Sequence, residues 1–275
     1  DSAYHGAAFS LTADALHFVN CNGLIEIHDC LIENTMDDAV NVHGIYTELE
    51  SAEKGALRVR LKHHEQKGVN VYRAGDRLHL IDPASMEIVS EFRVSETAFD
   101  GDGLTAIRIA GEFLFGEAAA RAGCFVENPG RMPDVHVWKN RFFHFPNLRI
   151  SGGGKLLIED NGMECGCSAL TVTDLAQYWF ESGRVRDLVF RRNRMKDCNA
   201  LGGSAFIRVS VSGFRDAETP KIHGRVEISD NTFHGVTNAA IRMAGVRNPI
   251  LRGNRADAEK LLIDGTESVF GDGLQ

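Results

Sequence analysis

The chain has 275 residues, of which 43% are hydrophobic and 25% are charged, and it carries a formal net charge of −8 at pH 7. This composition is that of an ordinary globular protein, and the length is sufficient to bury a large core. Because the net charge is negative and the basic residues do not cluster, the composition argues against a nucleic-acid-binding protein.

The chain opens with DSAYHGAAFS, which has neither the basic start nor the apolar segment of a signal peptide. It leads directly into strand-like sequence, so we expect that upstream residues have been removed. No apolar run approaches the roughly eighteen residues that a transmembrane helix needs, and we expect no membrane span.

A sequence template recurs along the chain: alternating apolar residues, a polar residue, Asn, and an apolar residue two positions further on. It appears at 25–33, with Cys30 in place of Asn, and again at 135–143, 156–164, 188–196, 226–234 and 249–257. The spacing of these segments is that of one coil of a right-handed parallel β-helix, whose short strands stack on the next coil. Asn is expected at the coil corner because it tolerates the left-handed αL conformation and bonds neighbouring backbone.

Residues 46–128 interrupt the template. Strand-like runs at 56–62, 76–82, 87–94 and 104–113 are joined by turns rich in Gly and Asp. They predict a small antiparallel β-barrel or sandwich inserted into a β-helix loop, and GEAAARAG (116–123) is the one convincing helical run. The predicted fold class is therefore all-β, with β-helix coils in 1–45 and 129–275 on either side of the insertion.

The six cysteines show no spacing typical of a zinc site, because Cys165 and Cys167 are separated by a single residue. Cys21 and Cys30 lie in apolar surroundings and are predicted to be buried free thiols.

Two adjacent acids, Asp37 and Asp38, stand in the strand-like stretch TMDDAVNVHG (35–44). The repeat provides a comparison, since other coils carry Ser168–Ala169, Ser204–Ala205 and Asn238–Ala239 at the same register. Two like charges side by side cost stability, so the replacement of a small polar residue and alanine by two acids indicates a function rather than a folding role.

A third acid lies one coil earlier. TADALHFV (12–19) matches TMDDAVNVH in phase at an offset of 24 residues, which places Asp14 over Asp38 on one sheet. Asp37, one residue earlier than Asp38, should point differently. Stacked carboxylates repel, which raises the pKa of one and leaves the other ionised.

Such a pair provides the acid and the base, or the nucleophile, of glycoside hydrolysis. Carboxyl groups about 5–5.5 Å apart suit a retaining enzyme and about 6.5–9.5 Å an inverting one, and the sequence leaves both open. A purely structural or calcium-binding role is the alternative for these acids.

The segments DALHFVNCNG, TMDDAVNVHG and YWFESGRVRDLVFRRN resemble glycoside hydrolase family 110, the α-1,3-galactosidases. The resemblance implies a β-helix with an inserted barrel and a bacterial protein that is secreted, periplasmic or cell-surface. It also implies inverting hydrolysis of terminal α-1,3-linked galactose, as in blood-group-B or linear α-Gal glycans, without a cofactor or metal. Leu16 stands where the family has threonine.

Carried over to matching positions, the resemblance makes Asp14, Asp37 and Asp38 the catalytic residues. Asp14 is expected to be the general acid and Asp38 the base, with Asp37 orienting water or sharing that role. The expected partners are a glycan with terminal α-galactose and a second copy of the chain in a homodimer.

Six further residues are candidates for substrate binding: His17, Asn41, His43, Arg149, Trp179 and Glu181. The first three lie on the same coils as the acids, and Trp179 offers a flat apolar surface for a pyranose face. Each of the six also has an ordinary structural interpretation as a satisfied polar residue or a coil-edge aromatic.

Rival functions are a polygalacturonase-like hydrolase, a β-helix lyase and a non-catalytic carbohydrate-binding β-helix. A polygalacturonase should place several Lys or Arg beside the acids, yet the nearest clear basic residues in the sequence lie in the insertion. A lyase should depend on a metal.

Overall fold

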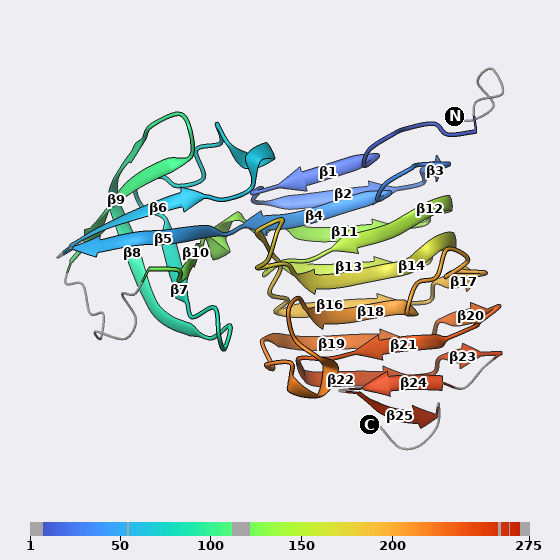
Figure 1. Ribbon diagram of the computed structural model, residues 1–275. Helices are drawn as coiled ribbons and strands as arrows, with labels where there is room; N and C mark the ends of the chain where they lie inside the picture. Colours follow the sequence, from blue (N-terminus) through green and yellow to red (C-terminus); the bar gives the residue numbers. More distant parts are fainter. Residues whose placement is uncertain (1–7, 54, 112–121, 258–259, 264, 270–275) are drawn as a thin grey trace.

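The computed structural model describes residues 8–53, 55–111, 122–257, 260–263 and 265–269. It consists of stacked coils and a barrel that leaves the stack beside the first coils (Figure 1). The predicted all-β class, a parallel β-helix with an inserted antiparallel barrel, is confirmed. The helix expected at 116–123 falls almost entirely on 112–121, outside the described residues. No helix in the described ranges is long and apolar enough to cross a membrane.

One face of the coil stack is a parallel six-stranded sheet. In spatial order its strands are β2 (Leu24–His28), β11 (Asp134–Trp138), β13 (Lys155–Glu159), β16 (Asp187–Arg191), β19 (His223–Ser229) and β22 (Val246–Arg252). Inward residues such as Ile27, Val137 and Ile158 stack in register and are buried. Burial of such apolar rows is the main stabilising contribution to the coils.

The second face contains the strands that carry the predicted site. Its main path is β1 (Leu16–Val19), β4 (Val40–Ile45), β12 (Arg141–Ile150), β14 (Gly162–Asp174), β18 (Ala205–Val211), β21 (Ala239–Met243), β24 (Lys260–Ile263) and β25 (Thr266–Val269). Shorter strands at the coil corner are β3 (Leu31–Glu33), β17 (Arg194–Lys196), β20 (Thr232–His234) and β23 (Arg255–Ala256). The two-residue strand β15 (Glu181–Ser182) pairs antiparallel with β4.

The recurring Asn residues form a ladder along the coil corners. Asn161 donates from Nδ2 to the carbonyl of Val137 at 3.0 Å and to Oδ1 of Asn193 at 2.9 Å. The same pair of bonds is repeated at the other positions of the ladder, which are Asn140, Asn193 and Asn231. Cys30 takes part only through its backbone amide, which donates to Asn140 Oδ1.

The Asn side chain at the coil corner bonds neighbouring backbone, as expected. The expected αL conformation, however, belongs to the residue before Asn, for example Asp160 with φ 57° and Arg192 with φ 55°. Asn is therefore required for its amide group and not for its backbone conformation.

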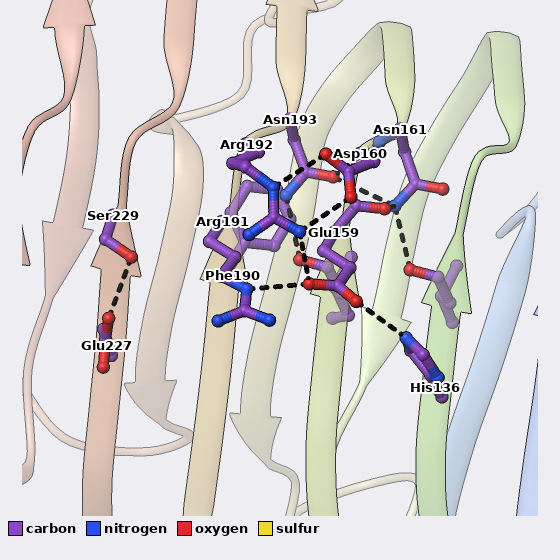
Figure 2. A network of polar contacts seen from close by, with 12 residues as sticks. His136, Glu159, Asp160, Asn161, Phe190, Arg191, Arg192, Asn193, Glu227 and Ser229 are labelled. Atoms are coloured by element: carbon purple, nitrogen blue, oxygen red, sulfur yellow. Dashed lines mark hydrogen bonds and ion pairs between the residues drawn. The ribbon is translucent and has the colours of Figure 1, made fainter.

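The outer face of the six-stranded sheet carries an ion-pair network between coils, seen in Figure 2. Glu159 accepts bonds from His136 on one neighbouring coil and from Arg191 and Arg192 on the other, at 3.0, 2.7 and 2.7 Å. These charges hold the pKa of Glu159 low, against the effect of its burial. The network fixes the register of three adjacent coils.

The inserted barrel is closed by six strands. They are β5 (Thr47–Glu53), β6 (Ala56–Leu61), β7 (Arg77–Ile81), β8 (Ile88–Phe99), β9 (Leu104–Ala110) and β10 (Phe125–Glu127). Of the short 3₁₀ turns, η1 (His64–Gln66) lies within the insertion, whereas η2 (Pro129–Arg131) and η3 (Asp216–Glu218) follow it in the chain. Because β5 follows β4 after a single residue, the barrel is attached directly to the end of β4, the strand that follows Asp37 and Asp38 in their coil (Figure 1).

All six cysteines are free thiols, but the predicted burial of two of them is wrong. Cys21 is half-buried and Cys30 is exposed. Both lie on the first coil of the described part of the chain, where no further described coil covers them.

Candidate active site

A cavity of about 450 Å³ opens between the first coils, β15 and the η1 turn of the barrel. All nine residues singled out in the sequence line it: Asp14, His17, Asp37, Asp38, Asn41, His43, Arg149, Trp179 and Glu181. Its size is within the usual range for small-ligand sites. The roles assigned to these residues remain predictions.

Asp14 and Asp38 are stacked as the offset of 24 predicted. His17 pairs with Asn41 in the parallel β1–β4 register, and the backbone amide of Ala15 donates to the carbonyl of Asp38 at 3.0 Å. Oδ1 of Asp14 accepts a bond from the amide of Asp38 at 3.0 Å, and Oδ2 accepts one from Asn41 Nδ2 at 3.2 Å.

Asp37 is exposed, whereas Asp38 is buried, so the two neighbouring acids differ in direction. One carboxylate oxygen from each of Asp14, Asp37 and Asp38 nevertheless lies within 4.8 Å of the other two. Asp37 Oδ1 also accepts from the amide of Asp38, at 2.9 Å. The alternation of side chains holds only inside a strand, and both acids precede β4, which begins at Val40.

The alignment with other coils needs one correction. Through successive pairings Asn41 lies level with Arg149, Thr171 and Arg208. The pairing of β12 with β14 shifts register between Asn147 and Arg149, and Asn147 pairs with Ser168. Since Leu148 pairs with Val40, Ser168 lies level with Ala39 and not with Asp37 as expected.

Asp38 is buried and is bonded by the next coil. Asn147 Nδ2 donates to its Oδ1 at 3.0 Å, and Arg149 Nε donates to its Oδ2 at 2.9 Å. Burial raises the pKa of Asp38, and the charge and hydrogen bond of Arg149 oppose that rise. Charge-assisted bonds of this kind hold a carboxylate in a fixed orientation.

Asp14 has no such cation bonded to it. Burial raises its pKa, the bond from Asn41 lowers it, and the charge of Asp37 raises it again. The two stacked acids therefore differ in their partners: Asp38 has a guanidinium, and Asp14 has amides and the imidazole of His17, whose Nδ1 lies 3.4 Å from Asp14 Oδ2.

The two histidines lie against each other. Their Nε2 atoms are 2.9 Å apart, and His43 Nδ1 is 2.7 Å from the carbonyl oxygen of Gly44. Burial lowers the pKa of His43 to about 4, so this ring is neutral at ordinary pH.

Glu181 lines the same pocket from β15, with its Oε1 3.5 Å from His43 Nε2. Burial raises its pKa to about 7, Arg149 opposes the rise, and the nearby acids add to it. A carboxyl group with this pKa can hold a proton near neutral pH, as an acid catalyst or a hydroxyl donor must.

The barrel supplies a wall that the sequence did not reveal. The ring of His63 lies against that of Trp179, with 4.5 Å between the ring centroids and a tilt of 41°, and Gln66 Nε2 donates to the carbonyl of Trp179 at 2.7 Å. His63, Glu65, Gln66 and Val69 all line the pocket. The sequence KHHEQK is typical of any polar turn, so only the three-dimensional contact identifies it.

Among the described residues, three buried polar atoms of the pocket residues have no hydrogen-bond partner. They are Asn41 Oδ1, His63 Nε2 and Gln66 Oε1. Such atoms are costly unless a ligand or water pairs with them, and hydroxyl groups of a sugar could do so.

The spacing of the three acids would also admit a cation, but their partners do not fit one. Calcium needs about six to eight oxygen ligands. Both oxygens of Asp38 already accept bonds from Asn147 and Arg149, and the guanidinium would repel a cation at that point. The arrangement fits a carboxylate pair better than a metal centre.

The chain is similar to one protein-family model and to several curated proteins. Residues 56–110 match the family model of the GLAA-B beta-barrel domain II. Alpha-1,3-galactosidase A of Bacteroides fragilis (strain YCH46) is 30% identical over 236 residues, which are 83% of this chain and 38% of that protein. Alpha-1,3-galactosidase A of Shewanella woodyi is 26% identical over 83% of this chain and 37% of its own length.

Alpha-1,3-galactosidase B of Bacteroides thetaiotaomicron is 27% identical over 80% of this chain and 37% of its own length. The chain thus spans well under half the length of the curated relatives it matches. The tailspike of Acinetobacter baumannii bacteriophage AP22, solved with a capsular saccharide, aligns with 95% of this chain and 69% of its own. At 9% identity and a TM-score of 0.21, that likeness carries no argument. Over about four fifths of its length the chain is therefore similar to proteins named alpha-1,3-galactosidase, which is consistent with the resemblance to glycoside hydrolase family 110.

Proposed function

We propose that the protein is an exo-acting glycoside hydrolase that removes terminal α-1,3-linked galactose, of the blood-group-B or linear α-Gal type. The observation that carries the proposal is the cluster of Asp14, Asp37 and Asp38 in a cavity of sugar size. The names of the relatives add the substrate class. Because such glycans lie outside the cell, secretion or surface display belongs to the same proposal.

In this proposal Asp14 donates a proton to the glycosidic oxygen as the bond to the leaving group breaks. Asp38 takes a proton from the water that attacks the anomeric carbon, and Asp37 orients that water. A base must be ionised, which the bond from Arg149 favours for Asp38. An acid must be protonated, which the burial of Asp14 and the charge of Asp37 favour.

The stereochemistry of the product is the finer part of the proposal. We propose inversion because the related family is inverting. Proton NMR of freshly released galactose decides, since inversion gives the β-anomer first and retention the α-anomer.

The decisive assay compares the wild type with Asp38→Asn on a disaccharide ending in α-1,3-linked galactose. We expect the variant to lose about 10²- to 10⁴-fold in kcat, the usual contribution of a general base. A wild type that hydrolyses no such substrate would overturn the proposal. A variant as fast as the wild type would overturn the assignment of Asp38 alone.

The polygalacturonase alternative is weaker in the structure. Arg149, from the coil after the insertion, stands beside the acids, whereas the nearest clear basic residues were expected in the insertion. It is nevertheless the only Lys or Arg among the described residues lining the pocket, and Asp38 already engages it. A polyanionic substrate would require several free cations there.

A further inference from the structure

The hydrogen-bond chain Gly44–His43–His17 fixes where one proton sits. A carbonyl oxygen only accepts, so His43 Nδ1, 2.7 Å from the oxygen of Gly44, must carry the hydrogen. His43 is 4% exposed and neutral, because burial lowers its pKa to about 4. Its Nε2 is therefore a bare acceptor.

The tautomer of the neighbouring ring, His17, follows from that of His43. Since His43 Nε2 has no hydrogen, the 2.9 Å contact between the two Nε2 atoms requires His17 to donate. Nδ1 is then the ring nitrogen of His17 at which a proton can be gained or lost. That atom lies 3.4 Å from Oδ2 of Asp14.

We propose that His17 is a positioning residue that returns the proton to Asp14 after each turnover, with His43 fixing its tautomer. The proposal rests on the proposed function. Asp14 gives its proton to the leaving oxygen and becomes a carboxylate. His17 Nδ1 then takes a proton from solvent, and the imidazolium passes it to Asp14 Oδ2, which restores neutral His17 and protonated Asp14. Solvent can supply that proton because the His17 side chain is 46% exposed.

Other titratable groups face the pair without replacing it. Glu181 Oε1 approaches His43 Nε2 at 3.5 Å, and the charge of Asp37 raises the pKa of Asp14. Arg149 is engaged by Asp38 and disfavours a proton on His43. Among the described side chains, His17 is the one whose imidazole nitrogen lies 3.4 Å from a carboxylate oxygen of Asp14.

The test uses two substrates that differ in their need for an acid. The disaccharide has a poor leaving group, whose departure needs the proton of Asp14. The p-nitrophenolate of p-nitrophenyl α-galactoside is a good leaving group and departs without that proton. His17→Gln keeps an amide near Nε2 for His43 and removes Nδ1. His17→Asn places an amide near Nδ1 that cannot titrate. His43→Asn keeps a donor for the carbonyl of Gly44 but removes the Nε2 acceptor that fixes the tautomer of His17.

We expect both His17 variants to lose about 30-fold or more in kcat on the disaccharide, within the range of acid–base assistance, and several-fold at most on the aryl galactoside. His43→Asn should show a smaller loss of the same kind. The basic limb of kcat/KM on the disaccharide should move to lower pH in His17→Gln, because a shared proton is lost at higher pH than one held by Asp14 alone.

Equal losses on both substrates together with a raised KM would overturn the proposal, because His17 would then merely bind the sugar. Full activity of His17→Asn would also overturn it, since a hydrogen bond without titration would suffice. Thermal unfolding midpoints check that the variants fold. A wild type inactive on both substrates would instead refute the proposed function, so the two failures are distinguishable.

Discussion

Nε of Arg149 lies 2.9 Å from Oδ2 of Asp38, and the two residues belong to adjacent coils whose strands β4 and β12 run in register. The coil on one side of Asp38 therefore supplies its cation, and the coil on the other side supplies the stacked acid Asp14. The site is a product of coil stacking, because each acid takes its chemical character from a different neighbour.

Arg149→Gln should impair catalysis through Asp38. Without the guanidinium, only the hydrogen bond from Asn147 still opposes the rise that burial causes in the pKa of Asp38, so the acidic limb of kcat/KM should move to higher pH. The free energy of unfolding should fall by about 2 kcal/mol, the usual value of a hydrogen bond to a charged group. Arg149→Lys, which keeps the charge, should shift the limb less. An unmoved limb would show that Arg149 does not control Asp38.

Asn193→Ala should destabilise the coils. The change leaves the buried amide of Asn161 and the carbonyl of Ile158 without their partners. We expect the free energy of unfolding to fall by about 2–4 kcal/mol, measured by urea titration. The exposed Asn248, outside the ladder, serves as the control, since its alanine variant should change stability by less than about 0.5 kcal/mol. Equal effects would refute the role of the ladder.

Trp179→Ala should weaken substrate binding. Trp179 lines the pocket, and its replacement by alanine removes the flat surface on which the sugar ring would pack. KM should therefore rise about 3- to 10-fold while kcat changes little. Tyr178→Ala is the matched control, because Tyr178 is exposed and does not line the pocket. Steady-state kinetics on the disaccharide make the comparison, and a similar rise in both variants would assign the effect to loop structure.

Asp174→Asn should change the dependence of stability on pH. Burial raises the pKa of Asp174 to about 7, so the folded protein binds its proton more tightly than the unfolded chain. Stability should then fall as pH rises from about 4 to 7. Asparagine can still accept the bond from the Tyr46 hydroxyl. The variant should flatten this slope in thermal unfolding, and an unchanged slope would contradict the pKa.

The sequence predicted features that repeat. The Asn positions and the offset between Asp14 and Asp38 follow from the coil period, because each coil is aligned on the last. The approach of Asp37 to the other two acids could not be predicted, because Asp37 lies before the strand, where no period applies. His63 could not be predicted, because its contact with Trp179 joins segments more than a hundred residues apart that share no repeat.

The fold also separates two tasks. The carboxylates stand on rigid coils, whereas residues 62–69 of the barrel face them across the pocket. New acceptor preferences could therefore arise by exchanging one short turn of the insertion, while the chemistry stays untouched on the coils. A graft of that turn between relatives would be the natural way to redirect which glycan is trimmed.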